Sequence, residues 1–403
     1  MDVASKTILI VTDTYYPVNI SASVQMTDLA NEFARLGYRL LVVTPLIKSI
    51  IESDDHHVSS IDILRVKCLS AKDSNYFYRG ISEFLMPFVM IRELKKLRLD
   101  ELCVEGIIWY SPTIFFGPLI YWAKRKFKCK SYLILRDLFP DWAVDAGVMR
   151  KGLIYRILKW VEKYQYRQAD VIGVQTPANL PHLQHWKSDL RQIEVLPNWL
   201  APLEIKSCSL QIAETTLAGR KIFVYAGNMG VAQDMTPIID MVASLQSMRD
   251  WGFLFVGRGS EVDNIRRRIA ADKLDNILLR DEIQPHEIPG LFAQCHIGIV
   301  ALDPRHTTHN IPGKFIAYMR SGLPVLARIN KGNDLKDVIH ANGVGIAIDE
   351  PGQAKLQLAA LDLMALPNEA LSAQSRAAKD LWAAQYSAEA CARQILDRLE
   401  HSQ

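Results

Sequence analysis

The stretch of sequence that decides the fold is HNIPGKFIAYMRSGLPVL, residues 309–326. Pro312 suits the first turn of an α-helix, because the N–H that it lacks has no helical partner there. Gly322 would end that helix, since glycine readily adopts the left-handed conformation found after a helix C-terminus. Pro324 then enters the apolar run at residues 323–329, which has the length of a strand. We therefore predict a helix followed directly by a buried strand.

Lys314 falls in the first turn of this predicted helix. A cation there opposes the positive end of the helix dipole unless an anion is bound. The helix dipole and the ammonium together hold an anion well. An anion-binding role for Lys314 is therefore favoured over that of a solvated surface lysine.

Short apolar runs alternate with longer helical patterns on both sides of this stretch. Strands are predicted in the first half at residues 7–13, 38–45, 61–68, 106–111, 131–137, 170–176 and 192–198. Strands are predicted in the second half at residues 221–227, 251–257, 276–282, 295–302, 323–329 and 344–348. Nearly continuous apolar strands are typical of parallel sheets that helices cover on both faces. We predict an α/β protein with two Rossmann-like domains facing a central cleft, because such sheets bind ligands at their carboxyl ends.

The domain boundary is predicted near residue 200, because residues 200–219 show no strand pattern. One Rossmann-like domain is expected at residues 1–200 and a second at residues 201–380. A C-terminal helix at residues 381–403 is expected to cross back to the first domain, with Trp382 and Tyr386 as its anchors.

The composition excludes a disordered chain, since 49% of the 403 residues are hydrophobic and 23% are charged. The net charge of +3 is unevenly distributed, with 26 Lys+Arg against 21 Asp+Glu in residues 1–200 and 21 against 23 in residues 201–403. The six cysteines lie at least 26 residues apart, so no zinc-binding spacing occurs. No membrane span is expected, because prolines and a glycine interrupt the longest uncharged stretch at residues 106–123.

Two glycine-containing stretches follow predicted strands of the second half. Residues 225–230 read YAGNMG, which would close a strand and open a helix directly. Small residues there either let a backbone approach a phosphate at the helix N-terminus or form a plain strand-to-helix turn. Residues 255–261 read FVGRGSE, which lacks the third glycine of a dinucleotide fingerprint, so NAD is disfavoured. Arg258 between these glycines either faces a diphosphate bidentately or is a surface charge on a turn.

These features together resemble the retaining glycosyltransferases of family 4, which have the GT-B fold. The resemblance covers essentially the whole chain and is carried by Pro-x-Lys and Tyr-Met-x-x-Gly-x-Pro-Val at residues 312–325, Gly-Asn-x-Gly at 227–230 and Leu-Pro-Asn at 196–198. The segment RDLFPDW at residues 136–142 resembles the bacterial branch that builds O-antigen and capsule repeat units. The stretch at residues 322–335, which includes Asn330, is similar to N-acetyl-L-fucosamine transferases.

The resemblance implies roles for individual residues. Lys314 matches the lysine that holds the donor diphosphate, and residues 227–230 match the loop under the transferring sugar. Arg136 stands where many members have a histidine. The implied catalytic set is Lys314, Arg258, Arg136, Asp137 and His309, and the implied donor-binding set is Gly227, Asn228, Gly230, Asn310, Pro312, Gly313, Asn333, Asp334 and Leu335.

The chain departs from the family at two glutamates spaced eight residues apart, which fall on His309 and Ala317. One of these carboxylates usually contacts the donor sugar and the other the nucleotide ribose. Their loss leaves His309 or Asn310 to meet the sugar, with Asn310 and Tyr318 as the nearest candidates for the ribose.

The activity implied is transfer of a sugar from a UDP-sugar, with retention of configuration, to an undecaprenyl-diphosphate-linked saccharide in surface polysaccharide assembly. The N-terminal domain would then bind the acceptor and the C-terminal domain the donor, with no cofactor and no metal expected. The enzyme would mainly stabilise the departing negative charge. Two alternatives remain, namely a catalytically silent sugar-nucleotide-binding subunit and a non-hydrolysing UDP-sugar epimerase.

Basic residues concentrate in the first half. Five cations occur within residues 124–130, and residues 149–167 hold six cations and four aromatic residues against one acid. Such a mixture on one helix suits an anionic membrane surface, while a solvated helix with its aromatic side chains in the core is the alternative. The chain is expected on the cytoplasmic face of the plasma membrane as a peripheral protein. Nucleic acid is not expected as a partner, because no recognition motif occurs.

Overall fold

The computed structural model describes residues 6–18, 20–46, 59–68, 76–97, 99–145, 147–188, 191–304, 311–350 and 352–400. The chain divides into two compact units. The N-terminal unit comprises Met1–Pro197 together with Ala388–Gln403, and the C-terminal unit comprises Asn198–Ser387. The chain therefore passes between the units twice, after Pro197 and after Ser387.

The N-terminal unit is built on a parallel sheet. Among the residues that the structure describes, this sheet has seven strands in the order β3-β2-β1-β4-β5-β6-β7. Its inner strands are apolar and buried along their length, as strands covered on both faces must be. The strands are β1 (Thr7–Val11), β2 (Arg39–Pro45), β3 (Ile61–Val66), β4 (Val104–Ser111), β5 (Lys130–Leu135), β6 (Val171–Val174) and β7 (Gln192–Val195).

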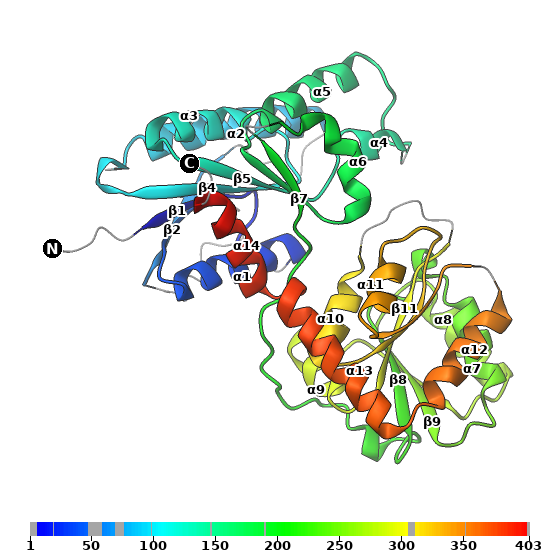
Figure 1. Cartoon of the computed structure of the whole chain (residues 1–403). Helices are drawn as coiled ribbons and strands as arrows, with labels where there is room; N and C mark the ends of the chain where they lie inside the picture. The colour runs from blue at the N-terminus through cyan, green and yellow to red at the C-terminus, as the bar shows by residue number, and fades with distance from the viewer. Residues whose placement is uncertain are drawn as a thin grey trace. The chain divides into compact units, whose positions relative to one another are not determined.

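Helices cover both faces of this sheet (Figure 1). α1 (Ser21–Arg35) and α14 (Ala388–Glu400) pack against each other on one face. The opposite face carries α2 (Tyr76–Leu94), α3 (Gly117–Phe127) and α5 (Leu153–Tyr166), and the short helices are α4 (Asp141–Asp145) and α6 (Leu180–Leu183). None of the helices that the structure describes is long and apolar enough to cross a membrane.

α5 exposes less positive charge than its cations in the sequence suggested. Lys159 forms ion pairs with Asp141 at 2.9 Å and with Glu162, because the buried Glu162 carboxylate needs a cationic partner. Tyr166 is buried in the core, whereas the Trp160 side chain is exposed. Lys159 is therefore a structural lysine and does not contribute to the exposed charge of this helix.

The C-terminal unit repeats the same plan. Its sheet, as far as the structure describes it, has six parallel strands in the order β10-β9-β8-β11-β12-β13. The chain order reverses direction between β8 and β11, which is where sheets of this type bind ligands beyond their carboxyl ends. The strands are β8 (Lys221–Ala226), β9 (Trp251–Val256), β10 (Ile277–Arg280), β11 (Ile297–Ala301), β12 (Val325–Arg328) and β13 (Gly345–Ile348).

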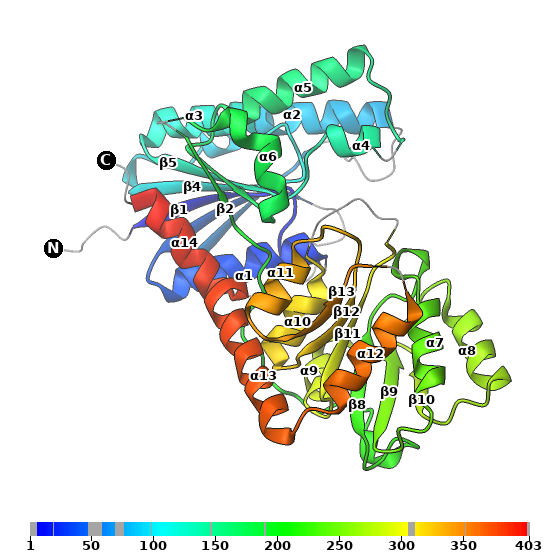
Figure 2. The same cartoon turned by 45° about the vertical axis from the view of Figure 1, so that its right-hand side comes forward.

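Two apolar clusters fill the two faces of the second sheet. Helices cover both of these faces (Figure 2). Alternate residues of β8 supply both clusters, with Ile222 and Val224 on one face and Phe223 and Tyr225 on the other. The first face is covered by α9 (Ile288–Phe292), α10 (Gly313–Ser321), α11 (Leu335–Ala341) and α13 (Asn368–Leu381), and the second by α7 (Thr236–Ser244), α8 (Val262–Ala271) and α12 (Gln353–Met364).

The C-terminal helix predicted at residues 381–403 returns to the N-terminal unit as expected, but it begins only at Ala388 and is not continuous from residue 381. A π-helix at Trp382–Tyr386 follows α13, and Ser387 is extended before α14 begins. The Leu200 N–H donates to the Tyr386 carbonyl at 3.0 Å, and this contact requires the backbone to leave helical geometry. Tyr386 packs edge-on against Phe315, with ring centroids 6.0 Å apart, in the core of the C-terminal unit. It is therefore not an anchor on the N-terminal unit.

The fold class is confirmed, since both units are parallel α/β domains. Each strand that the structure describes lies within, or within two residues of, one of the predicted apolar runs. The predicted runs mostly end one or two residues late, as with 221–227 against Lys221–Ala226. Several of these runs close on a polar residue or a glycine that already lies beyond the strand, such as Asp13, Asp137 and Gly227.

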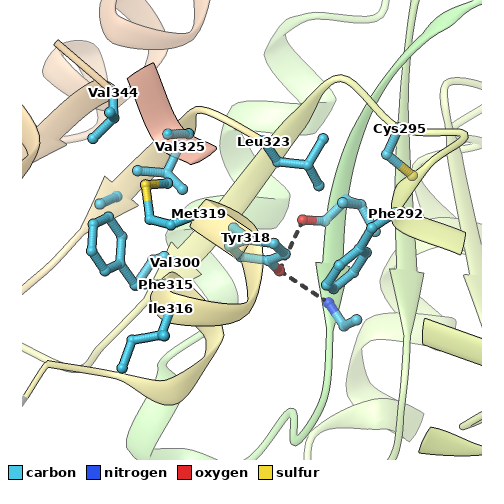
Figure 3. Close-up of a cluster of buried hydrophobic side chains, with 14 of the residues drawn as sticks. Phe292, Cys295, Val300, Phe315, Ile316, Tyr318, Met319, Leu323, Val325 and Val344 are labelled. Carbon is cyan, nitrogen blue, oxygen red and sulfur yellow. Dashed lines mark hydrogen bonds between the residues drawn. The ribbon is translucent and has the colours of Figure 1, made fainter. Parts of the chain in front are cut away.

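One side chain fixes α10 against the sheet. Tyr318 is fully buried, and its hydroxyl donates to the Val224 carbonyl at 3.2 Å and accepts the Ala226 N–H at 3.3 Å (Figure 3). β11 pairs with β8 only at Phe223 and Val224. Beyond these residues, the Tyr318 hydroxyl makes the backbone hydrogen bonds that a neighbouring strand would otherwise make. A Cβ at Gly298 would lie 2.5 Å from the Tyr318 ring, which explains the glycine. Tyr318 is therefore a core residue, and the suggestion that it binds a ribose is wrong.

Replacing Tyr318 by phenylalanine removes the hydroxyl and leaves two buried backbone groups of β8 without this partner. We expect Tyr318→Phe to lower the free energy of unfolding by about 1–3 kcal/mol, measured by urea denaturation. Tyr121→Phe is the matched control, because the Tyr121 side chain is exposed. Equal stability of the two variants would contradict this role.

Candidate functional site

Two glycine loops lie side by side at the carboxyl ends of β8 and β9. The Gly227 N–H donates to the Val256 carbonyl at 2.8 Å, which extends the strand pairing into the first loop. The Met229 N–H then donates to the Arg258 carbonyl at 2.7 Å, and the Met229 carbonyl accepts the Glu261 N–H at 3.0 Å. The two stretches singled out in the sequence, 225–230 and 255–261, therefore form one backbone-paired surface.

Glycine is required where these loops touch. Gly257 has φ +151°, and a Cβ there would lie 2.0 Å from the Gly227 carbonyl oxygen. Gly259 has φ +147°, and its Cβ would lie 2.3 Å from the Met229 carbonyl oxygen. Both residues combine a conformation that other residues rarely adopt with a gap too small for a side chain. The GxG pattern therefore serves close packing of two loops.

Lys314 reaches this surface from the first turn of α10. A Cβ built on Gly227 would lie 2.9 Å from the Lys314 Nζ, so the ammonium lies directly against the glycine backbone. The Nζ also lies 4.9 Å from the centroid of the Tyr225 ring, within cation–π range. Burial lowers the pKa of the Lys314 amine below its usual value. No ion pair of Lys314 is found among the residues that the structure describes.

Backbone N–H groups at the start of α10 lie next to this cation in the chain. Pro312 is extended, with φ −63° and ψ 138°, and its carbonyl accepts the Phe315 N–H at 3.0 Å. The Gly313 and Lys314 amides precede the first intrahelical acceptor, as the first amides of any helix do. The prediction of Pro312 at the helix start is therefore correct, and a cation and free amides occur together there.

The far end of the first loop is held by side chains. The Gln233 Oε1 accepts both the Asn228 Nδ2–H and the Gly230 N–H, each at 3.0 Å. The Tyr225 hydroxyl donates to the Asn228 carbonyl. A 3-10 turn at Val231–Gln233 follows the loop, and α7 begins only at Thr236. The expected direct passage from loop to helix N-terminus is therefore wrong.

An ion pair that the sequence analysis missed fixes this turn. The Arg328 guanidinium at the end of β12 donates to the Asp234 carboxylate at 2.8 Å and to the Asp234 carbonyl at 3.3 Å. The Arg328 side chain is only 13% exposed. An arginine within the otherwise apolar run 323–329 was the available signal, because such a charge needs a buried partner.

The structure shows Arg258 as a surface charge. Its guanidinium pairs with the Glu282 carboxylate at 3.2 Å, and its side chain is 78% exposed. A bound diphosphate would have to replace Glu282 as its partner. Contact between Arg258 and a diphosphate stays a prediction.

The loop at residues 330–335 forms a separate polar cluster after β12. The buried Asn333 donates through Nδ2 to the Asn330 Oδ1 at 2.9 Å, and its own Oδ1 accepts the Leu335 N–H at 3.0 Å. Asp334 is the N-cap residue of α11. These contacts assign Asn333 to the start of α11, and donor binding by residues 333–335 stays a prediction.

The candidate residues of the N-terminal unit follow β5. The Arg136 guanidinium donates to the Leu196 carbonyl at 2.6 Å and to the Pro197 carbonyl at 3.1 Å. It therefore holds the chain where the N-terminal unit ends, and the neighbouring Asp137 is exposed. The catalytic roles of both residues stay predictions.

The remaining predicted positions surround α10. His309 and Asn310 lie outside the described residues. Ala317 is half-buried and packs against the apolar cluster beneath α10. No group of three His, Cys, Asp or Glu side chains within the described ranges is arranged to hold a metal ion.

The contact between the glycine loops can be tested by a single methyl group. Gly257→Ala adds both a clash with the Gly227 carbonyl and an unfavourable φ, so we expect a loss of at least about 2–3 kcal/mol in unfolding free energy. Gly219→Ala separates these effects, because Gly219 has φ +77° and open space around it. This control should cost only about 1–2 kcal/mol. Equal losses in thermal or urea unfolding would argue against the tight contact.

Comparison with known proteins agrees with this geometry. Residues 220–365, which contain both glycine loops and Lys314, match the family described as Glycosyl transferases group 1. The probable glycosyltransferase WbjE of Pseudomonas aeruginosa is 24% identical over 278 residues, covering 66% of this chain and 67% of WbjE.

Solved structures share the fold of both units. WaaG, a glycosyltransferase involved in lipopolysaccharide biosynthesis, has a TM-score of 0.56 at 14% identity, covering 98% of this chain and 100% of WaaG. Anabaena Alr3699/HepE, solved in complex with UDP and glucose, has a TM-score of 0.62 at 14% identity, covering 98% of this chain and 100% of that one. The chain therefore has the two-domain GT-B fold, and its residues 220–365 form a glycosyl transferases group 1 domain.

Proposed function

We propose that this protein is a retaining glycosyltransferase that moves a sugar from a UDP-sugar to a lipid-linked saccharide in bacterial surface polysaccharide assembly. The half-buried Lys314 ammonium carries this proposal. It lies against the Gly227 backbone, and the described residues offer it no ion pair. A diphosphate at this position would neutralise the cation and would accept hydrogen bonds from the free amides at the start of α10.

The chemistry consists mainly of stabilising a leaving group. As the sugar–phosphate bond breaks, its electron pair moves to the diphosphate oxygen, and negative charge develops beside Lys314. The acceptor hydroxyl attacks the anomeric carbon from the same face and gives its proton to the departing diphosphate. The sugar keeps its configuration, and the products are UDP and the extended saccharide.

Support for the substrates comes from fold neighbours and from the resemblance in the sequence. The Anabaena neighbour was solved with UDP and glucose, which supports UDP as the nucleotide. WaaG acts in lipopolysaccharide biosynthesis, which supports a surface polysaccharide as the product. The stretch at residues 322–335 supports N-acetyl-L-fucosamine as the transferred sugar.

A second candidate function is a sugar-nucleotide-binding subunit without catalysis. The observation that favours it is Ala317 in place of a carboxylate, because the ribose hydroxyls then need another partner. A buried unpaired hydroxyl costs about 1–3 kcal/mol, so affinity for the donor would rest largely on the diphosphate. UDP binding without UDP release, in the presence of acceptor, would identify this function. Consumption of a UDP-sugar without any acceptor would instead identify an epimerase.

We also propose an anionic membrane surface as a partner of the N-terminal unit, with the protein peripheral on the cytoplasmic face. The exposed cations around α5 support this proposal, and they are Arg150, Lys151, Arg156, Lys163 and Arg167. A lipid-linked acceptor would be presented at the same surface.

Lys314→Ala tests the proposed activity directly. We expect the variant to fold, because it removes a half-buried cation that lacks an ion pair among the described residues. Turnover, measured as UDP release with a UDP-sugar and a lipid-linked acceptor, should lose about 2–4 kcal/mol of transition-state stabilisation.

The matched control is Lys355→Ala, because Lys355 forms an exposed ion pair with Glu350 on the surface of the same unit. The control should retain full turnover and UDP binding. Near-normal turnover by a folded Lys314→Ala protein would overturn the assignment of Lys314.

A further inference from the structure

An apolar stripe runs along the exposed side of α2. Tyr78, Ile81, Leu85 and Phe88 are spaced by three or four residues, which places them on one side of the helix. Each of these side chains is between 38% and 65% exposed, and the neighbouring Phe84 is 50% exposed. A helix of a globular unit normally turns such a stripe towards the core, whereas Ile81, Leu85 and Phe88 of this stripe are exposed.

A second apolar stripe lies on α5. Leu153, Ile154, Ile157 and Trp160 are between 53% and 74% exposed, and they recur at helical spacing. The Trp160 ring stacks on the Tyr164 ring, with centroids 6.3 Å apart. Large exposed apolar side chains occur singly on most proteins, but contiguous groups mark binding surfaces.

The two stripes belong to one surface, because both rest on the start of α3. The Phe84 ring of α2 meets Phe115 edge-on at 6.3 Å, just before α3 begins. On the other side, a Cβ at Gly117 would lie 2.7 Å from the Tyr164 ring of α5. Figure 2 shows α2, α3 and α5 along the same side of the N-terminal sheet. We call this surface, formed by the exposed residues of α2, α3 and α5, the α2–α5 face.

Positive charge borders the α2–α5 face along α5 and at the end of α3. Arg156 and Lys163 are exposed on α5, while the only acid of that helix, Glu162, is buried and paired with Lys159. Arg125 is exposed at the end of α3, where the neighbouring Lys126 forms an ion pair with Asp100. A surface with apolar side chains and a cationic border matches the interface of an anionic bilayer. A second copy of the chain fits less well, because a symmetric contact would bring like charges together.

We infer that the N-terminal unit docks on an anionic lipid bilayer by inserting apolar side chains of both α2 and α5. This inference rests on the membrane partner of the proposed function. It adds α2, which the sequence did not single out, as a second helix in contact with the bilayer. Charge attracts the protein to the surface, and apolar insertion holds it there. Part of the binding therefore persists when salt screens the charges. The inference does not depend on the donor site, so vesicle binding and sugar transfer can fail separately.

The test uses the full chain and vesicles of phosphatidylcholine with or without phosphatidylglycerol. The wild-type protein should co-sediment with the anionic vesicles and retain measurable binding in 1 M NaCl. The variant Ile81→Ser/Leu85→Ser/Phe88→Ser should bind at least tenfold more weakly at both low and high salt. Arg156→Gln/Lys163→Gln should weaken binding at low salt only, because it removes attraction and leaves the apolar side chains in place.

Two controls keep the result interpretable. Ile205→Ser/Leu358→Ser removes exposed apolar side chains from the C-terminal unit and should bind vesicles like the wild type. UDP affinity and turnover with a soluble acceptor should be unchanged in the α2 variant, which also shows that it is folded. Brominated lipids should quench Trp160, and the quenching should fall in Trp160→Phe.

Three results would overturn the inference. Complete loss of wild-type binding in 1 M NaCl would mean that charge alone holds the protein. Normal vesicle binding by the α2 variant would remove α2 from the contact. A change in self-association, seen by sedimentation, without a change in vesicle binding would identify a second copy of the chain as the occupant of the α2–α5 face.

Discussion

The candidate site of the C-terminal unit depends on one unusual charge, the half-buried ammonium of Lys314 against the backbone of Gly227. Burial lowers the pKa of this amine, and each unit of lowering costs the folded state about 1.4 kcal/mol while the amine stays protonated. This cost is fully present below the pKa of the folded state and decreases as pH rises from that pKa to the usual pKa of a lysine. An anion bound at the ammonium would remove the cost at neutral pH, which is the physical reason for proposing a diphosphate there.

Several features of the fold hold this charge in place. Tyr318 fixes α10 by hydrogen bonding to the backbone of β8, where β11 no longer pairs with it. Gly257 lets the second loop support the first, and Arg328 holds the turn that follows it through Asp234. The site therefore lies where the chain order of the sheet reverses, and residues from β8, β9, α10 and β12 contribute to it.

The sequence was sufficient for the parts that depend on local pattern. The strands could be predicted because buried parallel strands are nearly continuous apolar runs. Lys314 could be recognised from its place after Pro312, and the glycine loops from small residues at strand ends. Contacts between distant segments could not be predicted, as the Arg328–Asp234 pair and the Tyr318 hydroxyl show. The break before α14 was missed for the same reason, because it depends on a backbone contact with Leu200.

The most direct measurement is the titration of the Lys314 side chain by NMR, in protein labelled with ¹³C at lysine Cε and assigned with the variant Lys314→Arg. Without ligand, the Lys314 resonance should titrate with a pKa below the usual lysine value, and saturating UDP should raise that pKa. UDP affinity should accordingly fall as the pH rises through the lowered pKa, because the deprotonated amine no longer attracts the diphosphate. An ordinary pKa that UDP does not change would contradict the assignment of Lys314 as the diphosphate-binding cation.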